Sequence, residues 1–468
     1  MSNLLQGLNT ALSSLLSHQI AIQTTEHNVA NASTPGYRRQ EAVLTPGIPY
    51  AVPSMRGQVV PGQIGTGVLV DRIRQYNMEF FDDRYRKILG ESKNWDMQTN
   101  VLKQVEASLS ETSEDGLVAK LDDFWTGWQG LSDDPTNMSL RADLLERADS
   151  LATAIRWRYD SLTKIQKDQN LTILERVDEI NSVASQIARL NVEIVTVKAA
   201  GNQPNDIIDQ RDQLINRLSE ISGASASIQE NGEAVVSIGG HALVIGATTF
   251  KLSATSSNLS NIYWEADGQA LTINRGELAG LFAARDQIIP NIINGLNDLA
   301  ANLVSTVNSL HTQGYAADGT TTNLNFFDPG ATSAADIRLS SDIDGHPENI
   351  AAAETVNSPG DGNMALKIAL IRDQAVMSAG KETINQYYTR KVAELGISIS
   401  HAETYTKDRQ AVADSLDQLR EAVSGVNLDE EAANLIRYQR AFQAATRMVS
   451  VIDEMLDKII NGMGVAGR

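Results

Sequence analysis

The sequence predicts an elongated, mainly α, multidomain protein with a small β insertion. Apolar side chains recur at helical spacing at both ends of the chain and through its middle. Aromatic residues make up only 5% of the chain, which suits long helices better than compact β-sandwiches. Hairpin-type turns are confined to one short segment. The chain has 468 residues, and single cores rarely exceed about 250 to 300, so several packed units are expected.

The first helix is apolar along one stripe and almost uncharged. Only Glu26 carries a charge before Arg38. A lone helix of this kind is marginal in water, because helices gain most of their stability by packing an apolar face against something else. The stripe has the 3-4 spacing of a coiled coil and consists of Leu5, Leu8, Leu12, Leu15, Ile22 and Val29.

The C-terminal segment continues the same rhythm and is the predicted partner of the first helix. Glu431 is the only interruption in its apolar stripe. At 1.5 Å per residue, each helix would be roughly 40 to 50 Å long. An alternative is that both helices lie separately on a common core, but the shortage of charge at the N-terminus favours a coiled coil. The stripe consists of Leu428, Leu435, Tyr438, Phe442, Val449, Ile452, Leu456 and Ile459.

A connector rich in proline and glycine follows the first helix. Five of the eleven prolines fall between residues 35 and 61. Proline fixes φ and lacks an N–H donor, so this segment is predicted to be extended and turn-rich. Residues 1–65 and 426–468 are together expected to form a terminal coiled-coil inner domain with its connector.

A helical body is predicted for residues 66–221 and 277–425. Residues 136–200 contain neither glycine nor proline, which predicts one or two very long helices. Pro290 is expected to kink the helix over 277–310. The helical pattern over 364–423 has an expected interruption near Gly380 and a further candidate at Gly396.

Residues 222–276 are predicted to form a small β outer domain. Asn231-Gly232, Gly239-Gly240 and Asp267-Gly268 are hairpin turn signals between β-favouring runs. Residues 318–346 are rich in Gly, Asp, Asn and Thr, and are expected to form a long surface loop.

The composition excludes several kinds of chemistry. The chain contains no cysteine, which rules out disulfides, thiolate metal sites and thiol nucleophiles. The net charge of −19, with no basic run, argues against nucleic-acid binding. Residues 1–65 carry three Arg against two Glu, and residues 426–468 carry five basic against six acidic groups, so the middle holds the negative charge. Both ends therefore look like surfaces meant to be buried.

Catalytic, cofactor-binding and metal sites are not predicted, and an enzyme is not expected. The six histidines are widely separated, the glycine-rich residues 62–67 lack a following Lys-Ser/Thr, and residues 342–345 lack the remaining ligands of a calcium loop. Trp125 and Trp128 are interpreted as core residues. No apolar run approaches the roughly 20 residues that span a bilayer. The first twenty residues lack the features of a signal peptide, so any export is expected without a cleaved signal.

The segment NVANASTPGYRRQ, residues 28–40, resembles the segment that follows the first helix in the family of bacterial flagellar rod, hook and hook-associated proteins. Three further segments resemble the hook-associated members at the hook-filament junction. Alternatives are another axial protein, of the flagellar rod or hook, and a secreted coiled-coil effector or adhesin. The three segments are DFWTGWQGLSDDPTNMSLRADLLERADSLA from Asp123, QPNDIIDQRDQLINRLSEI from Gln203, and SGVNLDEEAANLIRYQRAFQAATRMVSVIDEML from Ser424.

The resemblance implies a structural role as a mechanical adaptor for filament assembly. It implies self-assembly into a ring-like layer, contacts with the hook protein and the next hook-associated protein, and a cytoplasmic export chaperone at the C-terminal helix. It also implies a secreted, extracellular location at the hook-filament junction, without membrane insertion or nucleic acid. Terminal segments would fold on assembly, and loop 318–361 would replace a further outer domain. The turn after the first helix would be set by Asn31, Pro35, Gly36 and Tyr37.

Overall fold

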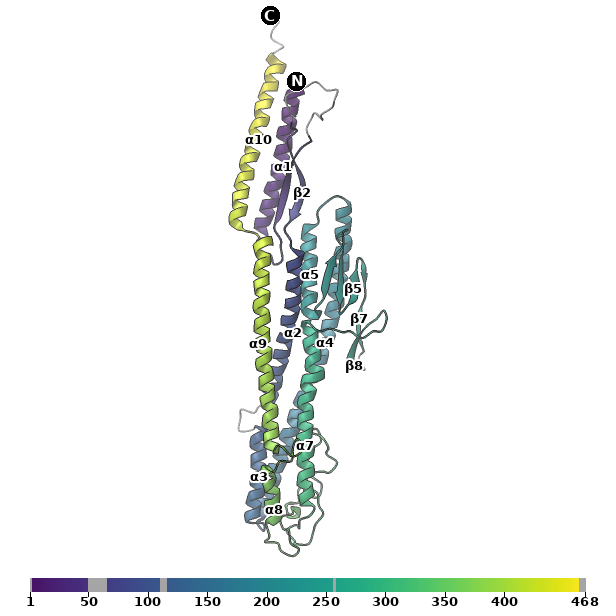
Figure 1. Cartoon of the computed structure of the whole chain (residues 1–468), viewed down its shortest axis with the longest axis vertical. Coiled ribbons are helices and arrows are strands. Elements are labelled where there is room, and N and C mark those ends of the chain that lie inside the picture. Colours follow the sequence, from purple (N-terminus) through teal and green to yellow (C-terminus); the bar gives the residue numbers. More distant parts are fainter. Residues whose placement is uncertain (1, 49–64, 110–115, 256–257, 463–468) are drawn as a thin grey trace.

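The computed structural model describes residues 2–48, 65–109, 116–255 and 258–462. The molecule is long and narrow, and its two ends lie together at one tip (Figure 1). There α1, Ser2–Ala30, lies beside α10, Leu428–Gly462. The remaining helices form a separate helical body below this terminal helix pair. The predicted fold class, mainly α and elongated with paired terminal helices and a small β insertion, is confirmed.

The terminal helix pair is antiparallel. Near one end, the Asn28 amide donates to Glu431 at 3.0 Å. Near the other, a Cβ placed on Gly7 would lie 3.3 Å from Cδ1 of Ile452. Residue numbers therefore rise along one helix as they fall along the other, and an apolar seam separates these two contacts.

A β-hairpin whose strand pairing the sequence did not predict packs against α1. β1, Gln40–Pro46, pairs antiparallel with β2, Val68–Gln75. The Ser17 hydroxyl donates to the Val68 carbonyl at 2.8 Å, which ties the hairpin to α1. The terminal unit therefore reaches Gln75, whereas the body was expected to begin at residue 66. Most of the predicted proline-rich connector, residues 49–64, lies outside the described residues.

The helical body is built from long helices whose ends carry clear signals. α4 is a single helix of 62 residues, as the absence of glycine and proline indicated, and the Asn137 side chain caps it by accepting from the Ser139 N–H. α9 begins with a capping box between Thr383 and Gln386 and runs through Gly396 without a break. The helices are α2 Glu79–Leu109, α3 Leu117–Asp133, α4 Met138–Ala199, α5 Asn205–Ser222, α6 Gly276–Ala283, α7 Ile289–His311, α8 Asn363–Ala369 and α9 Ile384–Ser424.

One of the expected interruptions takes a different form, and another occurs as predicted. Around Pro290 the chain forms a π-helical segment, Ala284–Ile288, and α7 then starts with Pro290 in its first turn. A proline there costs no hydrogen bond, so the π segment absorbs the change of register. The break around Gly380 occurs as expected, with 3₁₀ turn Leu370–Asp373 before it. A further 3₁₀ turn spans Pro347–Asn349.

The β insertion lies against α4 and α5 (Figure 1). The Asn191 amide of α4 donates to the Ala234 and Gly246 carbonyls and accepts from the Ala234 N–H, which fixes the sheet on the helix. One sheet has the order β3-β4-β5-β6 and the other pairs β7 with β8. The strands are β3 Ser225–Ile228, β4 Ala234–Ile238, β5 His241–Ile245, β6 Thr248–Thr249, β7 Leu252–Thr255 and β8 Asn258–Trp264.

An aromatic cluster forms the core at the far end of the body. Trp125 and Trp128 are buried, as predicted. Phe326 packs on Trp128 with ring centroids 5.0 Å apart, and Phe327 is equally buried. Residues 318–346 form no regular helix or strand, as the loop prediction expected, but the segment does not lie wholly on the surface, because Phe326 and Phe327 belong to the core. Two adjacent aromatics anchor this polar segment, and the Asn308 side chain holds the backbone of Phe327 through two hydrogen bonds of 2.9 Å.

Truncating Trp128 should strongly destabilise the body. Its side chain is fully buried, so Trp128→Ala is expected to lower the free energy of unfolding by about 3 to 5 kcal/mol through cavity formation. Trp157→Ala is the matched control, because Trp157 is 53% exposed. Urea unfolding followed by circular dichroism measures both. Equal losses in the two variants would contradict this assignment of the core.

Candidate assembly site

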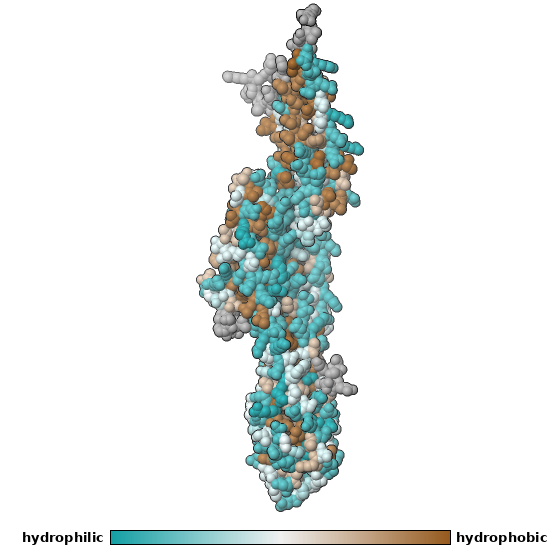
Figure 2. Space-filling model, turned by 180° about the vertical axis from the view of Figure 1, so that it is seen from behind, coloured by the Kyte–Doolittle hydropathy of each residue, from teal (hydrophilic) through white to brown (hydrophobic). Residues whose placement is uncertain are grey.

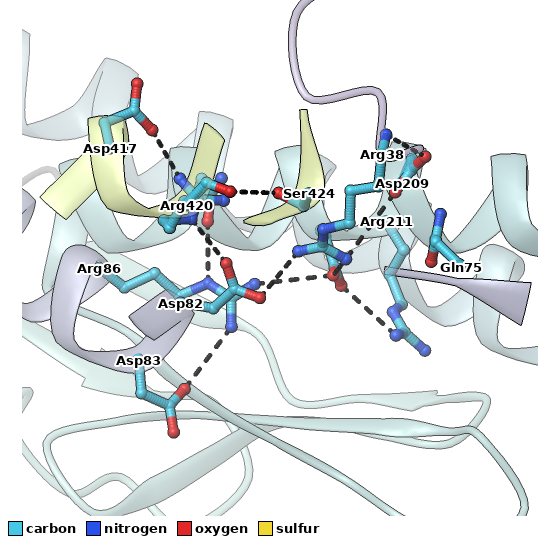
Figure 3. Close-up of polar contacts among 12 residues, drawn as sticks. Arg38, Gln75, Asp82, Asp83, Arg86, Asp209, Arg211, Asp417, Arg420 and Ser424 are labelled. Atoms are coloured by element: carbon cyan, nitrogen blue, oxygen red, sulfur yellow. Dashed lines mark hydrogen bonds and ion pairs between the residues drawn. The ribbon is translucent and has the colours of Figure 1, made fainter. Parts of the chain in front are cut away.

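Two segments that carried the family resemblance meet where the terminal helix pair joins the body. We call this region the joint: residues 34–40 of the connector, residues 205–213 of α5, the start of α2 and the end of α9 (Figure 3). Side chains from segments some 170 residues apart contact one another here, as in the ion pair between Arg38 and Asp212. The joint therefore links the chain's terminal unit to its body through side chains as well as through the backbone.

Arg38 lies at the centre of the joint and is buried. Its guanidinium donates to Asp212 of α5 at 2.6 Å and to Asp82 of α2 at 2.9 Å. Its backbone N–H donates to Asp209 at 3.1 Å. The second oxygen of Asp82 accepts from Arg420 of α9 at 2.7 Å. One buried guanidinium thus connects the connector, α2 and α5 directly, and α9 through Asp82.

Further guanidinium groups surround the carboxylates of the joint. Arg86 approaches Asp212 at 3.9 Å and donates to the Asn216 amide oxygen at 2.8 Å. Arg211 donates to Asp212 at 3.4 Å and to the Gly232 carbonyl at 2.6 Å, which also ties α5 to the β insertion. Charge-assisted hydrogen bonds of this kind have defined directions, so the network fixes geometry as well as charge balance.

The two α5 carboxyls of the joint respond differently to burial. Burial alone would raise the pKa of Asp212, but Arg38, Arg86 and Arg211 outweigh it and hold that pKa below its usual value. Burial raises the pKa of Asp209 to about 7, and Arg38 offsets only part of this effect. Consistently, Oδ1 of Asp209 has no hydrogen-bond partner.

Three of the predicted turn residues, Pro35, Gly36 and Tyr37, lie in the joint, and Asn31 lies beside it. Gly36 has a φ of +76°, and a Cβ there would come within 2.6 Å of the Gln213 side-chain nitrogen, so glycine is required. That nitrogen donates to the Pro35 carbonyl. The Asn31 amide donates back to the His27 carbonyl and closes the end of α1. These contacts hold the turn against α5.

Asn28, Arg39 and Glu431 form a second buried polar cluster at the base of the terminal helix pair. The Asn28 amide nitrogen donates to the Gln40 carbonyl and to Glu431, and its oxygen accepts from the Gln40 N–H and the Tyr37 hydroxyl. Arg39 donates to the other oxygen of Glu431 at 2.7 Å. The cluster thus joins α1, the turn and α10.

Sequence reasoning did not identify Arg38, Asp82, Asp209, Asp212 or Asn28 as site residues. A signal for the arginine was present, since Arg38 and Arg39 follow a stretch that carries only one charge. The aspartates gave a weaker signal, because acidic residues on a helix usually face water.

The predicted assembly residues divide into two groups. Ten lie in or beside the seam and are buried or half-buried: Leu8, Leu15, Ile22, Leu435, Tyr438, Phe442, Val449, Ile452, Leu456 and Ile459. Four lie on the exposed faces of the pair, contrary to the expectation that they build the seam: Leu5, Leu12, Val29 and Leu428. α10 covers one stripe of α1 and the β1–β2 hairpin packs against another part of it, yet these four side chains stay exposed among the described residues.

More exposed apolar side chains lie on the same two helices. They are Leu16, Ile20, Ile436, Met448, Val451, Met455 and Ile460. Figure 2 shows hydrophobic side chains running along the terminal tip, above a largely hydrophilic body. Exposed apolar surface of this extent marks an interaction site in a folded protein.

The described residues include no cluster of three or more His, Cys, Asp or Glu side chains arranged to hold a metal ion. Across that same part of the chain, none of the helices has the length and apolar character needed to cross a membrane. The geometry of the site is that of packing and ion pairing.

Comparison with known proteins identifies relatives over the whole chain. The family described as "Flagellar hook-associated protein FlgK helical domain" matches residues 102–327, and "Flagellar basal body rod FlgEFG protein C-terminal" matches residues 421–462. Flagellar hook-associated protein 1 of Bacillus subtilis is 30% identical over 513 aligned positions, covering 100% of both chains. The Escherichia coli protein of that name is 25% identical, covering 97% of this chain and 99% of its own.

A solved structure has the same fold. The flagellar hook junction protein FlgK from Burkholderia pseudomallei superposes with a TM-score of 0.65 at 15% identity, covering 73% of this chain and 100% of that one.

Replacing Asp209 should change how stability depends on pH. The pKa of Asp209 is raised from 3.8 to about 7, so the protonated carboxyl stabilises the fold fully below about pH 4, and this contribution is lost as the pH rises through 7. Asp209→Asn keeps an acceptor for the Arg38 N–H but cannot ionise. The variant should therefore be more stable than the native chain at pH 8, by about 1 to 3 kcal/mol.

Urea unfolding of both proteins at pH 5 and pH 8 measures this difference. Asp178→Asn, at an exposed carboxylate on α4, is the control and should leave the pH dependence unchanged. If Asp209→Asn keeps the native pH dependence of stability, the raised pKa of Asp209 is contradicted.

Proposed function

This chain belongs to the family of flagellar hook-associated protein 1, and from that membership we propose that it forms the junction layer between the hook and the filament of the bacterial flagellum. In this proposal several copies associate into a ring-like layer. One side of the layer contacts the hook protein, and the other contacts the next hook-associated protein. The role is structural, and the chain acts as a mechanical adaptor on which the filament assembles.

The observation that carries this proposal is the uncovered apolar surface of the terminal helix pair. Leu12 is 48% exposed on α1 and Val451 is 48% exposed on α10, although both helices are already paired. Burial of such side chains stabilises an assembly by about 25 cal/mol for each Å² of apolar area removed from water. Neighbouring copies can supply that cover, because each carries the same faces.

The division of the chain supports a layered arrangement. We propose that the terminal helix pair forms the inner layer and the helical body the next one, with the β insertion of residues 222–276 outside. Most of the net charge of −19 lies on the body and the insertion, which suits surfaces that stay in water. Loop 318–361 stands where a further outer domain would be in some relatives.

The joint supports a mechanical role. A load applied to the terminal helix pair reaches α2, α5 and α9 through buried ion pairs as well as through two short backbone links, one between β2 and α2 and one between α9 and α10. We also propose that the exposed face of α10 is covered by a cytoplasmic chaperone before export. The protein would then reach the outside of the cell through the flagellar export route, without a cleaved signal.

The function is tested by deleting the gene and returning variants of it. Cells without the gene should bear hooks without filaments and should release flagellin into the medium, as seen by electron microscopy and immunoblotting. Absent hooks would point instead to a hook or rod protein of the flagellum, and normal filaments would reject an axial role.

Variants on the exposed faces test the assembly surface itself. Leu12→Ser and Val451→Ser together should leave the monomer within about 0.5 kcal/mol for each site, because both side chains are exposed. They should nevertheless fail to restore filaments. Leu171→Ser is the control, since Leu171 is 60% exposed on α4 of the body. Full restoration of filaments by the double variant would contradict the proposed surface.

A further inference from the structure

The seam between α1 and α10 is repetitive, and repetition leaves its register ambiguous. On α10, residues seven apart face α1 in one series: Tyr438, Ala445, Ile452 and Ile459. Opposite them on α1 runs a series of small residues, also seven apart: Gly7, Ser14 and Ala21. The contact of Gly7 with Ile452 and the shared cluster of Ala21 with Tyr438 establish the observed alignment. A shift by seven residues in either direction would again place Gly7 and Ser14 opposite apolar members of the α10 series.

One polar contact interrupts this repetition. Glu431 stands seven residues before Tyr438, at the next position of the α10 series, and Asn28 stands seven residues after Ala21. Glu431 is only 2% exposed and Asn28 only 1%. The two side chains meet at 3.0 Å. The repeat therefore ends in a buried hydrogen bond, where an apolar contact would otherwise continue the series.

Asn28 cannot move to follow a shifted partner. Its other three hydrogen bonds go to the backbone of Gln40, at 2.8 and 3.0 Å, and to the Tyr37 hydroxyl, at 2.8 Å. Arg39, which donates to the other oxygen of Glu431 at 2.7 Å, also belongs to the turn. The turn thus positions two donors at a single place along α1.

A shift of α10 by seven residues in either direction removes the carboxylate from these donors. In one direction Glu431 would lie opposite Ala21, which offers no donor. In the other it would lie beyond the end of α1, and Tyr438 would face Asn28. Burying a carboxylate without a partner is strongly unfavourable, whereas Gly7 and Ser14 lie opposite apolar members of the α10 series in all three registers.

We propose that Glu431 sets the register of the terminal helix pair, through Asn28 and Arg39. The apolar seam supplies the attraction between the helices, and the carboxylate selects one alignment among several of similar packing. Buried polar residues select the register of coiled coils in this way at some cost in stability. The inference concerns pairing within one chain and does not depend on the proposed function.

The register can be read from cysteine pairs, because the native chain has no cysteine. Gly7→Cys is combined in turn with Ile452→Cys, Ala445→Cys or Ile459→Cys in the full-length protein. Residues seven apart on a helix are separated by about 10 Å, so a shorter thiol-to-thiol crosslinker distinguishes the three registers. Crosslinked peptides are quantified by mass spectrometry at low protein concentration. In the native background the pair of Gly7→Cys with Ile452→Cys should dominate by at least about tenfold.

Glu431→Leu should reduce that preference to about threefold or less, with crosslinks appearing at position 445 or 459. Glu431→Gln, which keeps the shape but places a donor against the donors of the turn, should give an intermediate ratio. Glu454→Leu is the control, because Glu454 is exposed on the same helix, and it should keep the native ratio.

Two results would overturn the proposal. Crosslinks confined to position 452 in Glu431→Leu would show that the hairpin and connector set the register without the carboxylate. Loss of all three crosslinks, with the body still folded by its tryptophan circular dichroism, would show that Glu431 is needed for pairing itself.

Discussion

Arg38 makes the contact on which the arrangement of this molecule depends. Its buried guanidinium is shared between Asp212 of α5 and Asp82 of α2, and Asp82 in turn holds Arg420 of α9. A buried ion pair adds little net stability compared with apolar packing, but removing one partner typically costs about 3 to 5 kcal/mol. The joint therefore acts mainly by specificity, because any other position of the terminal unit relative to the body would leave buried charges without partners. Its value lies in a defined geometry at the point where two units meet.

The two units on either side of the joint bury their apolar surface differently. The body has a core of its own, in which Trp128 and Phe326 are fully covered by the same chain. In the terminal unit, α10 and the β1–β2 hairpin cover part of α1, but apolar side chains such as Leu12 and Val451 remain exposed. A chain that completes one core and leaves another unfinished is suited to assembly, because other molecules can cover the part left exposed. The near-neutral charge at both ends is consistent with this division.

Much of the fold was predictable from local patterns. The 62-residue α4 follows from a stretch without glycine or proline, and the terminal pairing follows from two apolar stripes of which one has almost no charge. The β insertion follows from its three hairpin turns. The sequence did not predict that β2 lies beside α1, because the residues of a strand do not identify the segment against which it packs. The burial of Phe326 within a polar loop was missed for a similar reason.

The joint was the least predictable part. Arg38 and Asp212 each lie in a segment that resembles the family. Neither segment alone indicates that the two residues pair, because they are 174 residues apart. Acidic residues on α5 look like solvated positions until the partner is known. The four exposed positions of the predicted seam, among them Leu12, show the same limit, since periodicity marks apolar positions without saying which partner covers each.

Arg38 is expected to hold the terminal helix pair at one angle to the body. Spin labels at two exposed positions, Gln443→Cys on α10 and Lys407→Cys on α9, report that relation through pulsed electron paramagnetic resonance in the otherwise cysteine-free chain. The native protein should give one narrow distance distribution. Arg38→Met should broaden it clearly, while Arg84→Met, at an exposed arginine of α2, should leave it narrow. An equally narrow distribution in Arg38→Met would contradict the central role of the joint.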